Sequence, residues 1–278
     1  MKMRHKLLTA IAVLALGMTV AACGKEANTE DAEVAASETA EQTDDQSQSA
    51  DLAAGQSADD AVTAQSAGNA HIDFASLQAS NDEIIAWLQV PGTSIDCPVL
   101  KSSESDDHYR NHNSNKESDE AGAAYIEMAQ ESGFTDFNTV IHGHGGDGIF
   151  GELTNFANPD FFEKHQDMYI YLPDNQLTYA IWAVFERDNT SLIRDYSFAE
   201  AKGDREFLDY VYNGRIVGKQ VREGWEDLTE YNFLVTLTID EPGDDKQLVV
   251  IGAMTNDAAG TIDRDIVEEI DIGPLLTD

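Results

Sequence analysis

Two apolar runs near the C-terminal end of the chain constrain its fold most. They cover residues 233–240 and 247–254, and both are rich in β-branched side chains. The connection between them contains Pro242 and Gly243, which are typical of turns. The pattern predicts two neighbouring strands joined by a short loop, and the fold of this chain has to accommodate that pair.

Further strand-like segments precede this pair, and turn residues bound them. They are 84–90, 94–100, 168–172 and 179–185. Helical spacing is found over 73–81, where Asp73 can cap the first turn, and over 199–212. Many short strands separated by turn signals predict a mainly β fold closed into a barrel, with several added helices.

The N-terminal residues 1–23 have the pattern of a bacterial lipoprotein signal peptide. Lys2 and Arg4 precede the apolar run 7–20, and small residues lead up to Cys23. This pattern predicts cleavage before Cys23, lipidation of its thiol and an extracytoplasmic protein anchored to the cell membrane by lipid. Ordinary signal cleavage, with Cys23 incidental, is the alternative.

Residues 24–70 are dominated by Ala, Ser, Gln, Thr, Asp and Glu. Such a segment cannot bury enough apolar surface to offset its ordering entropy, so it is predicted to be an acidic, disordered tether. A single folded domain is expected over 71–278. The chain has 52 acidic and 17 basic residues, a net charge of −35, which argues against nucleic-acid binding because no basic patch is available.

Several blocks of the folded part resemble class B sortases, in the order of that family. Residues 87–99 read W-L-Q-V-P-G-T-S-I-D-C-P-V, which is similar to the family's opening hairpin, and 140–153 read V-I-H-G-H-G-G-D-G-I-F-G-E-L. The similarity covers about 200 residues. It implies a sortase-type eight-stranded β-barrel of class B character with several added helices, in an envelope of the Gram-positive type.

The resemblance also identifies three site positions. His144 falls on the family's catalytic histidine, Asp240 stands where the family has its nucleophilic cysteine, and Gln247 stands where it has its arginine. Sortases cut a sorting peptide through a thioester and pass the acyl group to an amine. A carboxylate is a poor nucleophile toward an amide, and a neutral amide is a weaker oxyanion donor than a guanidinium.

These replacements predict a pseudo-sortase without transpeptidase activity. We expect it to bind a peptide or protein of the cell envelope, such as a sorting signal or a pilin, without a cofactor. The alternative is an active, cysteine-independent transpeptidase or hydrolase that uses His144 with Asp240, with a metal as one option. A structural lipoprotein whose groove is blocked is a third class.

Other residues could serve as a nucleophile or as metal ligands. Cys97 is expected to be a buried free thiol, and Thr238 lies on the same strand face as Asp240. The spacing of His142 and His144, together with Asp147 and Asp240, is a weak pattern for a divalent metal. The simpler interpretation is an ion pair between His144 and Asp240.

Overall fold

The computed structural model describes residues 72–239, 241 and 243–268, all of which belong to one compact unit, Gln56–Asp278. The predicted signal peptide, the lipidation residue Cys23, the acidic tether and Asp240 lie outside the described residues. Among the described helices, none is long and apolar enough to cross a membrane.

Strands dominate the described part, with α-helices and two 3-10 helices (η) between them. The elements are α1 (Phe74–Ser80), β1 (Ile84–Gln89), β2 (Asp96–Lys101), η1 (His108–Arg110), β3 (Ala124–Ile126), β4 (Asn138–Gly143), η2 (Gly151–Ala157), α2 (Pro159–Lys164), β5 (Asp167–Leu172), β6 (Asn175–Asp188), α3 (Leu192–Asp195), α4 (Ala201–Asn213), β7 (Gln220–Val221), β8 (Leu234–Ile239) and β9 (Lys246–Asp257).

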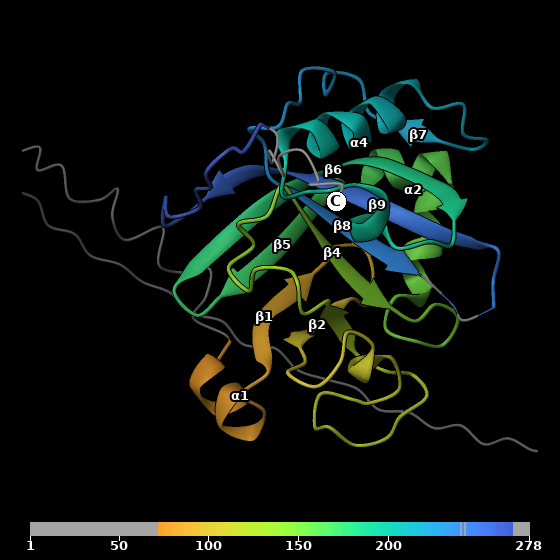
Figure 1. Ribbon diagram of the computed structural model, residues 1–278. Coiled ribbons are helices and arrows are strands. Elements are labelled where there is room, and N and C mark those ends of the chain that lie inside the picture. The colour runs from red at the N-terminus through yellow and green to blue at the C-terminus, as the bar shows by residue number, and fades with distance from the viewer. Residues whose placement is uncertain (1–71, 240, 242, 269–278) are drawn as a thin grey trace, which may run out of the picture. The chain divides into compact units, whose positions relative to one another are not determined.

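The strands form one sheet in the order β5-β1-β2-β3-β4-β8-β9-β6-β7, and a further pairing of β5 with β6 closes it (Figure 1). Only the two-residue β7 lies outside this ring, so eight strands make the barrel. The predicted eight-stranded, mainly β barrel with added helices is therefore confirmed. The two C-terminal strands pair antiparallel, as their sequence predicts, from Ile239↔Leu248 to Leu234↔Ala253.

Strands β6 and β9 are longer than the sequence indicates. β6 runs over 14 residues and β9 over 12, and the two pair along almost their whole length. Residues 181–185 of β6 are buried on both faces and lack the alternation that marks a half-exposed strand. Helix α4 explains this, because its Phe207, Leu208 and Val211 pack with Trp182 of β6 and Val249 of β9.

Helix α1 begins where the sequence predicts. Asp73 is its N-cap, and Asp73 Oδ1 accepts a hydrogen bond from Ser76 N at 3.0 Å. Phe74 is buried, as its spacing predicts. The β1–β2 hairpin turns at Gly92, whose φ of +94° suits glycine and whose missing Cβ leaves space for the His165 ring.

Candidate functional site

Three neighbouring strands position the predicted site residues. β4 pairs parallel with β8, with Gly143 opposite Ile239, and β8 pairs antiparallel with β9. His144 follows the last residue of β4, and Gln247 is the second residue of β9. The structure thus places the segments of His144 and Gln247 on β4 and β9, the two strands that flank β8. Asp240, the third predicted site residue, is outside the described part of the chain.

The His144 ring is held at both of its nitrogen atoms. Nδ1 lies 2.8 Å from Oε2 of Glu241, and Nε2 lies 2.5 Å from the carbonyl oxygen of Arg110. A neutral imidazole has one N–H and can donate to only one of these acceptors, whereas the doubly protonated ring can donate to both. Gly122 leaves room for this contact, since a Cβ there would lie 2.6 Å from the Arg110 oxygen.

Glu241 is a site residue that the sequence analysis missed. Its Oε1 accepts a hydrogen bond from Gly145 N at 2.7 Å, so one carboxylate holds both the imidazole and the backbone beside it. Asn189 fixes the loop, because its Nδ2 donates to the carbonyl of Glu241 at 2.9 Å. The sequence feature that could have indicated the role of Glu241 is its position as a second acidic residue directly after Asp240. The expected pair between His144 and Asp240 stays a prediction.

Gln247 is buried and all of its amide atoms are engaged. Its Nε2 donates to the carbonyl oxygens of Thr190 at 2.6 Å and Asp188 at 3.2 Å, while its Oε1 accepts from Thr238 Oγ1 at 2.6 Å. An amide NH₂ group has two hydrogens, so both are used by the backbone that follows β6. Gln247 therefore fastens the end of β6 and the residues after it to the barrel.

A guanidinium group lies beside Gln247, although it comes from another strand. Arg187 of β6 is the direct cross-strand partner of Gln247. Arg187 Nη1 donates to the same Thr190 carbonyl at 2.6 Å, and Arg187 Nη2 pairs with Asp195 at the end of α3. Because Arg187 is buried and ion-paired, it contributes to holding the 189–195 segment in place.

A polar pocket of about 470 Å³ lies between this segment, the 105–110 segment and the barrel. The residues that line it are Ser105, Asp106, Asp107, Arg110, Tyr125, Glu127, Val140, His142, Asn189, Thr190, Ser191, Leu192, Arg194 and Gln247. Gln247 belongs to the lining and His144 does not, although the backbone oxygen that His144 contacts belongs to the lining residue Arg110. A concave polar pocket of this size suits a side chain or a short stretch of peptide.

His142 lies at the base of the pocket in a setting different from that of His144. Its ring stacks on Tyr125, with ring centroids 5.2 Å apart, and its Nε2 lies 3.5 Å from Glu127 Oε1. The two histidines thus contact different carboxylates, Glu127 and Glu241. Within the described residues, no group of three or more His, Cys, Asp or Glu side chains could hold a metal ion.

Cys97 and Thr238 are both buried in the barrel. Cys97 is a free thiol in the hydrophobic core, as predicted, and burial together with the nearby Asp96 charge raises its pKa to about 12. The hydroxyl of Thr238 donates to Gln247, and its side chain is fully buried. Neither group has the exposure or the activated state that a nucleophile requires.

Known proteins share both sequence and fold with this chain. No protein-family model matches it. Sortase B of Listeria monocytogenes is 27% identical over 170 residues, which are 60% of this chain and 69% of the relative. Sortase B of Staphylococcus aureus is 26% identical over 140 residues, 50% of this chain and 56% of the relative, so the chain spans little more than half of that protein.

Solved structures show the same relationship. A class B sortase of Streptococcus pyogenes, described as involved in pilus biogenesis, superposes with a TM-score of 0.56 at 29% identity, covering 66% of this chain and 98% of that one. A substrate complex of Staphylococcus aureus sortase B has a TM-score of 0.58, covers 70% of this chain and 91% of its own, and at 22% identity shows a shared fold. By sequence and by fold, this chain is similar to class B sortases.

Proposed function

We propose that this protein is a catalytically inactive, class B sortase-like lipoprotein that binds a peptide or an envelope protein in the pocket beside Gln247. Lipidation of Cys23 would hold it at the outer face of the cell membrane. The partner would be a sorting signal, a pilin or another envelope polypeptide. A sorting peptide and a pilin are reasonable first choices, because related structures are described as a substrate complex and as an enzyme of pilus biogenesis.

The state of Gln247 is the observation that carries the proposal. The resemblance assigns this position to the arginine that assists peptide transfer. Here both amide hydrogens of Gln247 are donated to Asp188 and Thr190, so none remains for the oxygen of a bound peptide. Loss of one oxyanion donor costs about 3–4 kcal/mol in the transition state, and a neutral amide could replace a guanidinium only in part.

His144 supports the same conclusion. A general acid or base has to reach the reacting atoms with one ring nitrogen. In this structure Glu241 occupies one nitrogen and the Arg110 carbonyl occupies the other. The replacement of the family's cysteine by Asp240 adds to this, since an acyl-aspartate would be an anhydride that water hydrolyses. Peptide binding without cleavage agrees with the residues at all three positions, His144, Asp240 and Gln247.

Fluorescence with a labelled class B sorting peptide tests the proposal on the full chain. A peptide with a fluorophore and a quencher, mixed with triglycine as the amine acceptor, should show no cleavage above the blank, and its single-label form should show saturable anisotropy. Ser105→Trp, which fills the pocket rim, should weaken this binding, and Ser80→Trp on the exposed end of α1 should not.

Other outcomes would separate the alternatives. Cleavage that disappears in His144→Ala would favour the enzyme, and a requirement for added metal would favour its metal-dependent form. Absence of both binding and cleavage with sorting peptides and envelope extracts would favour the blocked, structural lipoprotein. Mass spectrometry of the N-terminal peptide, compared with a Cys23→Ala chain, tests the lipid anchor separately.

A further inference from the structure

The carboxylate of Glu127 is the least satisfied anionic group in the pocket. Glu127 directly follows β3 and has 14% of its side chain exposed. Its carboxylate lies 3.5 Å from His142 Nε2, which makes no hydrogen bond to it, and accepts a hydrogen bond from Ser191 Oγ at 3.4 Å, the long limit for such a bond. An ionised carboxylate has about four acceptor sites, so Glu127 has capacity for further donors.

Glu83 provides a matched comparison within the same chain. It is buried to a similar degree, with 9% exposed. Its carboxylate accepts three hydrogen bonds of 2.6 Å, from Ser103 N, Ser103 Oγ and Tyr109 Oη, and pairs with Lys116 at 3.2 Å. Glu83 is therefore saturated by its own protein, as buried carboxylates normally are. Glu127 is buried to a similar degree, but its carboxylate faces the pocket and accepts no comparable set of short hydrogen bonds.

The charge around Glu127 favours a cation. The neighbouring His142 lowers the pKa of Glu127 against the opposing effect of burial, and the charge of Arg194 lowers it further. Glu127 is thus anionic at neutral pH. Asp106 and Asp107 add carboxylates to the lining, and the net charge of −35 attracts cations from a distance.

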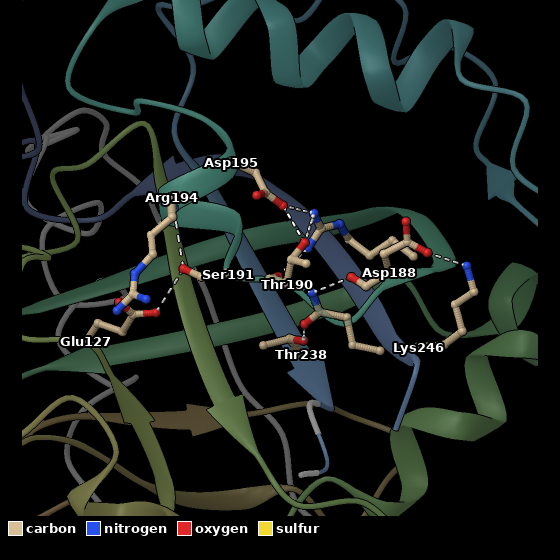
Figure 2. A network of polar contacts seen from close by, with 10 residues as sticks. Glu127, Asp188, Thr190, Ser191, Arg194, Asp195, Thr238 and Lys246 are labelled. Atoms are coloured by element: carbon tan, nitrogen blue, oxygen red, sulfur yellow. Dashed lines mark hydrogen bonds and ion pairs between the residues drawn. The ribbon is translucent and has the colours of Figure 1, made fainter. Parts of the chain in front are cut away.

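Two arginines also line the pocket, and their positive charges oppose the negative charges of these carboxylates. Figure 2 shows Arg194 and Ser191 of the same wall beside Glu127, and no ion pair within 4.0 Å joins Arg194 to Glu127 among the described residues. Arg194 is exposed at its position on α3, so its side chain can move into solvent when another cation approaches. Arg110 lines the wall on the side of the 105–110 segment.

We propose that Glu127 is the specificity-determining residue of the pocket and selects a basic side chain, lysine or arginine, of the bound polypeptide. An ammonium or guanidinium group supplies several N–H donors and a positive charge, which are what the Glu127 carboxylate lacks. Ligand binding would displace Arg194 from the vicinity of Glu127. This inference rests on the proposed peptide-binding function and adds the chemistry of the residue that is recognised.

A peptide library tests the inference on the immobilised full chain. The probes are short N-acetylated, C-amidated peptides with one fixed central residue, either lysine, arginine, norleucine, citrulline or glutamate, in otherwise randomised sequences. Mass spectrometry measures the amount of each pool retained at near-physiological salt. Lysine and arginine pools should be retained about tenfold better than norleucine and citrulline pools, as expected for a charge-assisted hydrogen bond in a pocket.

Glu127→Gln should abolish this preference, and Glu223→Gln, which removes an exposed carboxylate outside the pocket, should preserve it. A preference for basic pools that persists in Glu127→Gln would overturn the inference, because it would reflect only the overall charge. Retention of neutral and basic pools to the same extent would also overturn it, while leaving the proposed function intact. If no pool is retained above blank resin, the proposed function itself fails.

The comparison between norleucine and lysine changes only the ligand. Equal retention of these two pools would therefore overturn the inference even if Glu127→Gln lowers the yield of folded protein.

Discussion

The carboxylate of Glu241 bridges the imidazole of His144 and the backbone next to it. Its two oxygens lie 2.8 Å from His144 Nδ1 and 2.7 Å from Gly145 N. A residue of the β8–β9 loop therefore fixes the segment after β4, at the place where the two parallel strands end side by side. The arrangement turns a potential acid–base residue into part of a hydrogen-bonded frame.

Removing this bridge should loosen the β4 end locally. In Glu241→Ala we expect the Gly145 amide to exchange with solvent roughly three- to tenfold faster, because its carboxylate acceptor is lost. The global free energy of unfolding should fall by less than about 1 kcal/mol, since Glu241 is one-third exposed. Hydrogen exchange followed by NMR measures the first effect. Unchanged protection of Gly145, with Glu186→Ala as the control, would contradict the assigned bridge.

Gln247 should contribute to stability as well as to the shape of the pocket. Gln247→Leu leaves the carbonyls of Asp188 and Thr190 and the hydroxyl of Thr238 without this partner in a buried setting. We expect the free energy of unfolding to fall by about 1–3 kcal/mol, the cost of leaving such groups unsatisfied. Urea unfolding measures it. Gln166→Leu, at an exposed position, should change stability by less than about 0.5 kcal/mol.

The double variant Asp240→Cys with Gln247→Arg should gain peptide transfer. The cysteine restores a thiolate nucleophile, and the arginine restores a charged donor. Arg187 already occupies the Thr190 carbonyl, so the new guanidinium should be directed toward the pocket. Cleavage of a class B sorting peptide in the presence of triglycine is the measurement, with both single variants and a His144→Ala triple variant expected to be silent. No product from a folded double variant that still binds the peptide would show that Glu241 and the Arg110 carbonyl keep His144 from reacting, and loss of binding as well would show that the pocket no longer recognises the substrate.

The network around Glu83 predicts a pH dependence of stability. Burial opposes ionisation, but hydrogen bonds from Ser103 and Tyr109 and the Lys116 charge lower the pKa of Glu83 from 4.5 to about 2. A carboxyl group with a lowered pKa in the folded state stabilises fully above its unfolded pKa, and this contribution is lost as the pH falls from about 4.5 to about 2. At neutral pH the ionised Glu83 should therefore stabilise the fold by roughly 3 kcal/mol.

Glu83→Gln isolates this contribution. The difference in unfolding free energy between wild type and variant should be largest at neutral pH and should shrink as the pH falls below about 4. Urea unfolding at several pH values measures it. A difference that stays constant with pH would mean that the hydrogen bonds, and not the charge, account for the effect. Glu120→Gln, at an exposed position outside the network, is the control.

Strand positions and helix starts were predictable because they depend on local pattern. The alternation in β1, the turn at Gly92 and the cap at Asp73 all follow from residues adjacent in sequence. The length of β6 was not predictable in the same way. Its residues 181–185 are buried on both faces because α4 packs on the outside, which is a tertiary effect that no local pattern contains.

The candidate site likewise has a part that local sequence predicts and a part that depends on tertiary structure. His144 and Gln247 were found from the sequence because they stand in recognisable blocks, although their roles remain predictions. The partners of these residues were not found. Glu241 and the Thr190 carbonyl reach the site from loops and the Arg110 carbonyl from the end of η1, and two of the three contacts involve backbone atoms, which the residue type does not specify. The pocket and Glu127 likewise depend on how the 189–195 segment lies against the barrel.

The closure of the sheet by β5 and β6 has a consequence for copies of this protein that are crowded together. Open sheet edges offer unpaired backbone groups on which fibrils and swapped dimers can grow. In the described part of the chain the sheet ends at β7, which is two residues long. Such a short border gives little template for recruiting a second copy, so a dense layer of these molecules should resist amyloid-like growth as long as the barrel stays intact.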